Sequence, residues 1–464
     1  MQTRQPSQVV PTELLHRFDV AGPRYTSYPT ADRFIEAFDA DTYKTWLAKR
    51  SLVRTLQPLS LYVHLPFCGS ICYYCACNKV VTRDRGRSAK YVRHLEREIA
   101  MQGELLGKSP HVAQMHWGGG TPTFLADAEL ARLMEVIRSR FQLDDKGEFS
   151  IEIDPRALQS STLEVLRRLG FNRISIGVQD FDPDVQRAVH RVQSEEQTRE
   201  AMMQARRLQF RSINIDLIYG LPKQHVVGFN RTLEKVIASA PDRIALYNYA
   251  HLPAVFKPQR RIDEADLPSA ETRLQLLSLA IRRLTGAGYE YIGMDHFARP
   301  DDDLSVAQRQ GRLQRNFQGY STGAECDLIG LGISAIGQVG PTYSQNVKSL
   351  EEYYDRLDRG VLPILRGIEL SADDLLRRAV IQSLMCRFEV PIESLEIAHL
   401  IDFGSYFATE IADLLAFQKI GLLTLDDQWL SVTPLGRFFI RNICMVFDRY
   451  LREGRERARY SKAV

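Results

Sequence analysis

The sequence lacks any long hydrophobic run, and this absence argues against a membrane-spanning helix. No stretch of the 464 residues approaches the run of about 20 apolar residues that such a helix requires. The first residues, MQTRQPSQVVPTELLHRF, also lack the apolar core of a signal peptide. We therefore expect a cytoplasmic protein with no membrane partner.

The sequence also lacks a strong excess of charge of either sign. It contains 60 Lys and Arg residues against 57 Asp and Glu residues, a formal net charge of +3, which gives little reason to expect a nucleic-acid partner. The locally basic carboxy-terminal stretch LREGRERARYSK is interpreted as a solvated tail. With 44% hydrophobic residues the chain can bury large cores. We expect a folded protein and a monomer.

Cysteine is scarce and unevenly placed. Of the seven cysteines, Cys68, Cys72, Cys75 and Cys77 lie within ten positions. An odd number of cysteines, crowded at one place in a cytoplasmic chain, argues against a disulfide framework, because reducing compartments keep thiols free. The others stand singly in apolar surroundings, and we expect them to be small core residues: Cys326, Cys386 and Cys444.

The spacing of the clustered cysteines favours an iron–sulfur site over a zinc site. A structural zinc site pairs two C-x2-C-like elements or adds histidines, and a second element is missing here. Cys68, Cys72 and Cys75 form C-x3-C-x2-C, so one loop can hold three irons of a four-iron cluster and leave the fourth open to a non-protein ligand. Cys77 lies too close to Cys75 to reach the remaining iron easily. A thiol-rich loop without a cofactor has the least support, since clustered exposed thiols oxidise readily.

From about residue 58, apolar strand-like runs alternate with segments of helical periodicity, which is the pattern of βα units. The expected strands are 60–65, 113–117, 149–154, 173–178, 212–219 and 243–249, and the expected helices are 89–106, 127–140, 159–169, 194–209 and 228–239. The strands are almost continuously apolar, as in a parallel sheet that is covered on both faces. The pattern predicts an α/β fold, either a partial barrel or an open doubly wound sheet.

Changes in pattern divide the chain into three regions. These are an amino-terminal arm (1–55), a βα domain with an extension on the substrate side (56–360), and a mainly helical carboxy-terminal domain (361–464). Within the extension we expect a helix near 269–286, a strand at 289–294 and a polar, irregular loop over 298–325. A β-wing is expected at 422–433. A winged domain can bind DNA, but we favour a lid or packing role for it.

Polar residues end several predicted strands, where βα barrels assemble their active sites. Glu152, Gln179 and Asp216 lie at or near the carboxyl ends of their strands. After the second strand, HWGGGTPT has three successive glycines, which allow backbone groups to approach a ligand. No Lys-Ser/Thr pair follows these glycines, and IGLGISAIG (329–337) has the wrong glycine spacing, so the nucleotide-binding fingerprints fail.

The cysteine motif has the aromatic Tyr74 before its third cysteine and follows the first strand, and in this it resembles the radical S-adenosylmethionine superfamily. Further stretches resemble one family within it, the oxygen-independent coproporphyrinogen III oxidases: RYTSYPTADRF (24–34), YVHLPFC (62–68), CYYCACNK (72–79), HWGGGTPT (116–123), IEIDPR (151–156), SIGVQDFD (175–182), HFARPDDDL (296–304) and RNFQGYST (315–322). The RYTSYPT and NFQGYST elements matter most, because haem chaperones and haem-cleaving relatives look different there. Ala76 stands where glycine is common and Tyr74 where phenylalanine often is, and neither departure removes a ligand.

This resemblance implies a partial (β/α)6 radical-SAM barrel that binds a four-iron [4Fe-4S] cluster and two molecules of S-adenosylmethionine. The cluster ligands would be Cys68, Cys72 and Cys75. The contacts of the cluster-bound S-adenosylmethionine would be Tyr62, Gly119, Glu152 and Ile336. The contacts of the second molecule would be Tyr74, Gly120, Thr121, Gln179, Arg191, Asp216 and Ala250. The catalytic residues near both cofactors and the substrate would be Phe317 and Gln318.

The resemblance also implies a reaction, the oxidative decarboxylation of two propionates of coproporphyrinogen III to vinyl groups, which gives protoporphyrinogen IX in haem synthesis without oxygen. In this superfamily one electron, here from a reductant protein such as a flavodoxin or ferredoxin, cleaves S-adenosylmethionine to a 5′-deoxyadenosyl radical. The radical would take a hydrogen atom from a propionate β-carbon. Because the substrate carries four propionates, guanidinium groups are the expected anchors. Arg24 in the arm is the first candidate, and the weaker ones are Arg299, Arg309, Arg312 and Arg315.

Two other functions remain open from the sequence alone. A haem-binding chaperone on the same scaffold would bind haem but release no carbon dioxide from coproporphyrinogen. A zinc-bearing regulator that uses the carboxy-terminal wing would bind DNA and contain no iron.

Overall fold

The computed structural model describes residues 11–51, 57–107, 110–323, 326–454 and 460. Parts of three predicted regions lie outside the described residues, namely 1–10 and 52–55 of the arm, 324–325 of the polar loop, and most of the basic tail. Among the described residues, no helix combines the length and the apolar character needed to cross a membrane.

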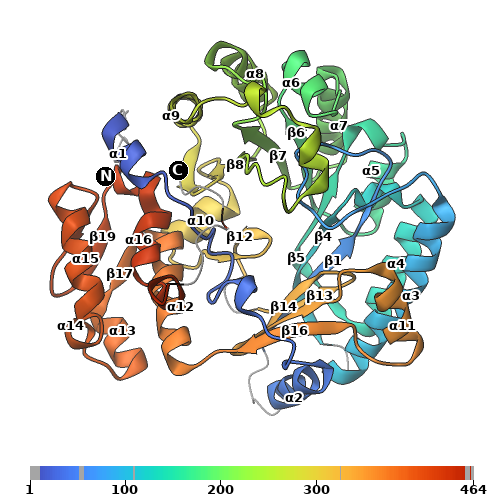
Figure 1. Cartoon of the computed structure of the whole chain (residues 1–464). Helices are drawn as coiled ribbons and strands as arrows, with labels where there is room; N and C mark the ends of the chain where they lie inside the picture. Colours follow the sequence, from blue (N-terminus) through green and yellow to red (C-terminus); the bar gives the residue numbers. More distant parts are fainter. Residues whose placement is uncertain (1–10, 52–56, 108–109, 324–325, 455–459, 461–464) are drawn as a thin grey trace.

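The centre of the molecule is a curved 12-stranded sheet with the strand order β16-β15-β14-β13-β1-β4-β5-β6-β7-β8-β10-β9 (Figure 1). Its parallel core consists of β13 (Asp327–Leu331), β1 (Leu59–Leu65), β4 (His111–Gly119), β5 (Gln142–Ile153), β6 (Arg173–Gln179), β7 (Ser212–Tyr219) and β8 (Arg243–Asn248). Every strand predicted before residue 250 is present in this core. Strand β13 was not predicted, because no helix directly follows its short DLIGL run and the βα alternation is lost there.

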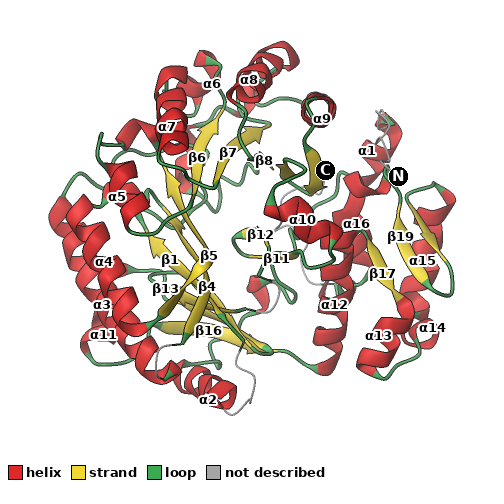
Figure 2. Ribbon diagram, turned by 180° about the vertical axis from the view of Figure 1, so that it is seen from behind, coloured by secondary structure: helices red, strands yellow, loops and turns green. Residues whose placement is uncertain are grey.

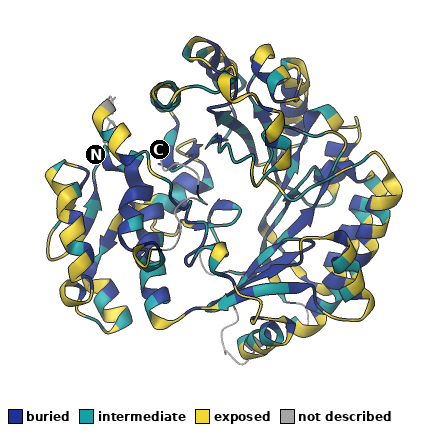
Figure 3. Ribbon diagram, in the orientation of Figure 1, coloured by how far each residue is buried: buried dark blue, intermediate teal, exposed yellow. Residues whose placement is uncertain are grey.

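Helices cover the outer face of the parallel core (Figure 1). They are α3 (Arg85–Leu106), α4 (Asp127–Arg140), α5 (Thr162–Arg168), α6 (Pro183–Ala188), α7 (Glu195–Arg207), α8 (Val226–Ser239), α9 (Ala270–Gly286) and α11 (Leu350–Asp358). The predicted helices are confirmed, and α4 has its predicted bounds. Figure 3 shows the strands buried and the outer sides of the helices exposed, as expected for strands that are apolar on both faces.

Antiparallel strands extend the sheet at both ends. At one end lie β14 (Ile336–Val339), β15 (Thr342–Asn346) and β16 (Ile364–Glu369), and at the other β10 (His296–Ala298) and β9 (Glu290–Gly293). The edge strands β16 and β9 do not pair with each other in the described part of the chain. Of the two sheet architectures that the sequence left open, the curved sheet is therefore a partial barrel.

The prediction of an irregular loop over 298–325 is wrong for most of its described residues. They form α10 (Asp303–Arg309) and an antiparallel hairpin of β11 (Gln314–Asn316) and β12 (Gly319–Ser321). Asp302 caps α10 by accepting from the N–H of Leu304, and Gly319 has a φ of +115° that suits the hairpin turn. These elements were not predicted because each is very short and the stretch is polar, so neither helical nor strand periodicity can be recognised.

The carboxy-terminal domain packs beside the open side of the sheet (Figure 2). Its helices are α12 (Ala372–Arg387), α13 (Ile392–His399), α14 (Phe403–Tyr406), α15 (Ala408–Lys419), α16 (Ile440–Val446) and α17 (Arg449–Arg452). Its three-stranded sheet comprises β17 (Glu389–Pro391), β19 (Trp429–Val432) and β18 (Leu423–Leu425), so the predicted wing is confirmed and gains a third strand. Cys386 and Cys444 are buried as expected, whereas Cys326 is only partly buried.

The amino-terminal arm contains α1 (Thr12–Phe18) and α2 (Ala40–Ser51) and crosses from the carboxy-terminal domain to the sheet. The hydroxyl of Tyr25 donates to Asp448 at 3.0 Å, and Ile35 forms a bridge with Gly367 of β16. Tyr25 and Tyr28 are each 1% exposed, so the arm is part of the packed core rather than a loose extension.

Candidate active site

The cysteine loop leaves the sheet directly after β1. Its base is closed by the short parallel pair β2 (Phe67–Cys68) and β3 (Val80–Val81) and by a 2.9 Å bond from the N–H of Thr82 to the carbonyl of Cys68. The N–H of Cys75 donates to the carbonyl of Cys72 at 3.2 Å, which makes a turn between these two residues. The loop thus holds three thiols at the carboxyl end of the parallel strands.

A cavity of about 240 Å³ opens at this end of the sheet. It brings together most of the residues expected to hold the cluster and the two cofactor molecules. Of these, the lining includes Cys68, Cys72, Tyr74, Cys75, Gly119, Gly120, Thr121, Glu152, Gln179, Arg191 and Asp216. The exposed Cys77 lines the same cavity.

The glycine turn after β4 lies against the cysteine loop. The N–H of Gly120 donates to the carbonyl of Leu65, and that of Thr121 to the carbonyl of Phe67, both at 2.8 Å. Gly119 has a φ of +110°, and a Cβ there would lie 2.4 Å from the His64 ring. A Cβ on Gly120 would lie 2.6 Å from the backbone of the cysteine loop. Both positions therefore require glycine for the strand end and the loop to approach each other.

Glu152 is a carboxylate of the cavity whose ionised form is stabilised by polar neighbours. Its carboxylate accepts the N–H of Gly119 at 3.1 Å and lies 3.4 Å from the Nε2 of His116. Burial raises the pKa of Glu152, but the contacts with His116 and Gly119 outweigh it and the net pKa is lowered. Glu152 is therefore ionised at neutral pH and can accept from an ammonium or a ribose hydroxyl.

Asp216 is a second carboxylate in the same cavity, in a different environment. It accepts from the Ser175 hydroxyl at 2.8 Å and from the Asn214 amide at 2.7 Å. Burial, together with the nearby charge of Glu152, raises the pKa of Asp216 to about 6. Asp216 therefore changes charge close to physiological pH.

Cations lie beside the cysteine loop. Arg191 and Arg156 approach the Sγ of Cys72 at 3.7 and 3.8 Å, and both guanidiniums also contact Asp154. Arg191 also donates to the carbonyl of Gly177 at 2.6 Å. Arg156 and Asp154 were not singled out from the sequence, although they follow β5 directly. Their position just after a strand end, in IEIDPR, was the signal that could have identified them.

The thiols differ in acidity. Burial raises the pKa of the Cys68 thiol to about 11. The hydrogen bond from Cys77 lowers the pKa of the Cys75 thiol to about 6. Among the described residues, no three His, Cys, Asp or Glu side chains converge closely enough to hold a single metal ion. A cluster makes a different demand, since each thiolate binds its own iron, and three thiols on one cavity wall beside two guanidiniums fit an anionic iron–sulfur cluster.

Tyr62, Ala250 and Ile336, the other residues expected to contact cofactors, are not among the lining residues of this cavity. The hydroxyl of Tyr62 is 3.0 Å from Nδ1 of His64, and its ring stacks on that of His116 at 6.0 Å. The carbonyl of Ala250 accepts from Gln259 at 3.0 Å, and the same amide donates to the carbonyl of Tyr74. Gln259 therefore ties the loop after β8 to the cysteine loop.

Phe317 and Gln318 lie at the tip of the β11–β12 hairpin and point to different neighbours. Phe317 and Ile336 both pack against a small hydrophobic cluster, and the ring of Phe317 lies 6.1 Å from that of Tyr343. Gln318 lines a second cavity of about 220 Å³, which shares Glu152 and Asp216 with the first. The Nε2 of Gln318 is buried and has no hydrogen-bond partner among the described residues, so it is available to a ligand.

Arg24 is not among the lining residues of the first cavity, but its guanidinium lies over the ring of Tyr247. Its guanidinium is 3.3 Å from Asp295 and 5.8 Å from the centre of the Tyr247 ring, which lines both cavities. With Arg441 it lines a smaller cavity against the carboxy-terminal domain. Of the weaker candidates, Arg315 is buried and lies 3.6 Å from Asp295. The exposed ones are Arg299, Arg309 and Arg312.

Comparison with known proteins agrees with this geometry. The family model described as the radical SAM superfamily matches residues 62–236, and that of the HemN C-terminal domain matches residues 370–439. Relatives from Pseudomonas aeruginosa and Escherichia coli, both named oxygen-independent coproporphyrinogen III oxidase, are 52% and 47% identical, and each alignment covers 97% of this chain and 98% of the relative. A solved Escherichia coli structure, described as coproporphyrinogen III oxidase and a radical SAM enzyme, matches with a TM-score of 0.91 and 46% identity over 96% of this chain and 100% of that chain. The chain therefore belongs to the radical S-adenosylmethionine superfamily and, within it, to the oxygen-independent coproporphyrinogen III oxidase family.

Proposed function

We propose that the chain converts coproporphyrinogen III to protoporphyrinogen IX by oxidative decarboxylation of two propionates. In each half of the reaction, a hydrogen atom leaves the propionate β-carbon, carbon dioxide leaves the carboxylate, and one electron passes to a one-electron acceptor. One vinyl group remains each time. One observation carries the proposal in a chain of this family: the three motif cysteines, the glycine turn, Glu152 and Asp216 line one cavity.

Membership of the superfamily implies a [4Fe-4S] cluster and S-adenosylmethionine. When bound, they supply the organic radical that removes the hydrogen atom. We assign the cluster to Cys68, Cys72 and Cys75. Glu152 would accept from the ammonium or ribose of the cluster-bound molecule, and its ionised state supports this role. The other contacts proposed for that molecule are Tyr62, Gly119 and Ile336.

A second S-adenosylmethionine would occupy the part of the cavity that Asp216 faces. Asp216 supports this proposal, because it is a second carboxylate in the cavity, has its own polar partners and is not assigned to the first molecule. The other residues proposed to hold the second molecule are Tyr74, Gly120, Thr121, Gln179, Arg191 and Ala250. Equilibrium dialysis with labelled S-adenosylmethionine tests the number: two molecules per cluster are expected, and a plateau at one would refute the second site.

On the substrate side, Phe317 and Gln318 would border the reacting propionate, and Arg24 would anchor another. The Nε2 of Gln318, which has no partner among the described residues, and the position of Arg24 over the ring of Tyr247, which lines both cavities, support these roles. Truncation of the arm is a poor test, because Tyr25 and Tyr28 are buried in the core. Arg24→Gln is sharper: we expect a raised KM for coproporphyrinogen III with unchanged affinity for S-adenosylmethionine, and an unchanged KM would refute the anchor.

The electron donor is proposed to be a small acidic protein such as a flavodoxin or ferredoxin. Arg83 and Arg85 are exposed and line a cavity of about 330 Å³ next to Cys68, which supports an anionic partner near the cluster. Reversal of these charges should slow turnover driven by flavodoxin but not turnover driven by dithionite. If the charge-reversed variant and the wild type turn over at equal rates with flavodoxin, docking at this surface is refuted.

Five expectations from the sequence remain proposals: the cytoplasmic location, the absence of a membrane partner, the monomeric state, the absence of a nucleic-acid partner, and the division at residues 55 and 360. The activity itself is tested by anaerobic incubation of the iron-loaded protein with coproporphyrinogen III, S-adenosylmethionine and a reductant. Protoporphyrinogen IX and two molecules of carbon dioxide per porphyrin are expected. Tight haem binding without release of carbon dioxide would support the chaperone instead.

A further inference from the structure

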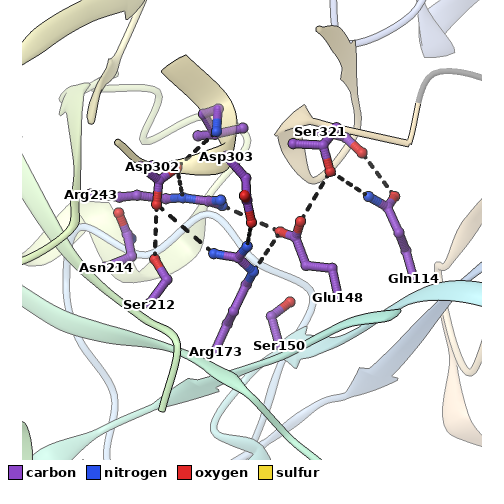
Figure 4. Close-up of polar contacts among 12 residues, drawn as sticks. Gln114, Glu148, Ser150, Arg173, Ser212, Asn214, Arg243, Asp302, Asp303 and Ser321 are labelled. Atoms are coloured by element: carbon purple, nitrogen blue, oxygen red, sulfur yellow. Dashed lines mark hydrogen bonds and ion pairs between the residues drawn. The ribbon is translucent and has the colours of Figure 1, made fainter. Parts of the chain in front are cut away.

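A buried network of charged residues lies where several parallel strands begin, whereas the cysteine loop lies where they end; Figure 4 shows the contacts of this network, which also lines the second cavity. Arg173, Ser212 and Arg243 are the first residues of the neighbouring parallel strands β6, β7 and β8. Glu148 of β5 lies beside them, with its carboxylate 3.2 Å from Nε of Arg173 and 3.3 Å from Nη1 of Arg243. This end of the barrel is called the barrel floor below.

The barrel floor holds the beginning of α10. Nε of Arg243 donates to Asp302 at 2.8 Å, and the Ser212 hydroxyl donates to the same carboxylate at 3.3 Å. Arg173 forms an ion pair with Asp303. The side chains of Arg173 and Asp302 are only 4% and 5% exposed, so these contacts lie in the interior rather than on the surface.

The same network holds the chain just beyond β12. The Thr322 hydroxyl donates to Glu148 at 3.1 Å and accepts from the amide of Gln114 at 3.2 Å. The Ser321 hydroxyl donates to Gln114 at 2.8 Å (Figure 4). The two ends of the segment 302–322 are therefore fixed to the same point, with Glu148 contacting Arg243 on one side and Thr322 on the other.

The β11–β12 hairpin lies between these two attachments and carries Phe317 and Gln318 at its tip. Its outer side rests on α12, where Gln382 exchanges hydrogen bonds with the backbone of Arg315. Its inner side faces the cavity that contains Glu152 and Asp216. Helix α12 therefore contacts the hairpin from outside, while the barrel floor contacts both ends of the segment that carries the hairpin.

The chemistry of the network suits a rigid attachment. Arg173, Arg243 and the exposed Arg211, which lies 2.9 Å from Asp303, balance the charges of Glu148, Asp302 and Asp303. Arg243 contacts Glu148 and Asp302 at once through different nitrogens. A guanidinium can bridge two carboxylates in a fixed geometry, while a lysine ammonium acts as a single point charge.

We propose that the ion-pair network of the barrel floor positions the β11–β12 hairpin, so that Phe317 and Gln318 meet the substrate at the correct distance from the cofactors. Arg243 and Glu148 also line the second cavity beside Gln318, but the role assigned to them and to Thr322 here is a positioning one, exerted through the hairpin. The catalytic part of this inference rests on the proposed function, whereas the structural part does not.

Arg243→Lys tests the inference, because it keeps the charge and removes the bridge. In protein without cofactor or substrate, we expect amides of 310–322 to exchange hydrogen faster while those of α3 keep wild-type rates. In the loaded enzyme we expect kcat to fall by about 10- to 100-fold, with unchanged affinity for S-adenosylmethionine and more 5′-deoxyadenosine formed per vinyl group. Wild-type hydrogen-exchange rates in 310–322, together with a wild-type ratio of 5′-deoxyadenosine to vinyl groups, would overturn the inference.

Thr322→Val supplies a second test, at the attachment beyond β12, and it preserves the shape of the side chain. It tests the same inference if Arg243→Lys does not fold. Arg206→Lys is the matched control, because Arg206 pairs with Asp242 at 2.7 Å near the same end of the barrel and, among the described residues, forms no hydrogen bond or ion pair with the hairpin. It should match wild type in both measurements. If the wild-type enzyme shows no decarboxylation, the proposed function fails, while the exchange rates still decide whether the network holds the hairpin.

Discussion

Arg191 donates a hydrogen bond from Nη1 to the Sγ of Cys72, over 3.7 Å. The same nitrogen lies 3.2 Å from Asp154, and the side chain of Arg191 is 8% exposed. A buried guanidinium therefore lies directly against one of the proposed iron ligands. The resemblance assigned Arg191 to the second S-adenosylmethionine, and the geometry adds a contact with the cluster loop.

The first prediction concerns this contact. A cation beside the cluster favours its reduced, more negative form, so Arg191→Met should lower the reduction potential. Arg191→Lys should keep it closer to wild type. Redox titration followed by electron paramagnetic resonance measures both, with Arg187→Met as the control, because Arg187 is exposed and pairs with Asp184. Equal potentials in Arg191→Met and wild type would show that the contact does not tune the cluster.

The second prediction concerns which thiols hold iron. Cys68→Ala, Cys72→Ala and Cys75→Ala should each lose most iron and all cleavage of S-adenosylmethionine. Cys77→Ala should retain a four-iron cluster, because Cys77 is separated from Cys75 by one residue, although its activity can fall since Cys77 lines the cavity. Iron and sulfide counted per chain after anaerobic reconstitution decide this. An iron-free Cys77→Ala beside an iron-replete Cys68→Ala would contradict the assignment.

The third prediction concerns Glu152. Glu152→Gln keeps the shape and removes the charge, so binding of S-adenosylmethionine to the cluster site should weaken by about 1.5–3 kcal/mol, roughly 10- to 150-fold. Isothermal titration with anaerobic protein measures the affinity. The exposed Glu164 provides the control, and Glu164→Gln should bind as wild type does. Wild-type affinity in Glu152→Gln would rule out this carboxylate as a ligand.

The fourth prediction concerns pH and Asp216, whose pKa burial raises to about 6. Because the fold favours the protonated form, the contribution of Asp216 to stability is present below pH 3.8 and is lost as the pH rises through about 6. Binding of a cationic second cofactor should show the opposite trend and weaken as the pH falls below about 6.

Asp216→Asn separates these effects. Dialysis at pH 5 and pH 7.5 should show pH-dependent occupancy of the second site in wild type and low, pH-independent occupancy in the variant. The unfolding free energy of the ligand-free variant should also lose the part of its pH dependence between about 4 and 6. A second site in Asp216→Asn that keeps the wild-type pH profile would show that another group controls it.

The sequence predicted the parallel core well because its strands are apolar on both faces and alternate with amphipathic helices. Cys68, Cys72, Cys75 and Glu152 could also be assigned to the strand ends, since the cysteines follow β1 and Glu152 lies next to the last residue of β5, whereas Asp216 lies three residues before the end of β7. These signals are local, within one βα unit.

Features that depend on contacts between distant segments could not be predicted. The Arg243–Asp302 pair joins a strand to a helix 59 residues later, and nothing in either stretch indicates the other. The β11–β12 hairpin was missed because two three-residue strands have too short a pattern, and it is stabilised by α12 and the barrel floor. A motif indicated Arg24, but its position over the ring of Tyr247 depends on packing against the carboxy-terminal domain.

The most direct test of the central claim uses coproporphyrinogen III carrying deuterium at the β-carbons of its propionates. The iron-loaded enzyme is incubated anaerobically with S-adenosylmethionine and a reductant, and the 5′-deoxyadenosine formed is analysed by mass spectrometry. We predict one deuterium in each 5′-deoxyadenosine that accompanies a vinyl group, because the radical takes its hydrogen from that carbon. Vinyl product accompanied only by unlabelled 5′-deoxyadenosine, or cleavage of S-adenosylmethionine with all four propionates intact, would contradict the proposed function.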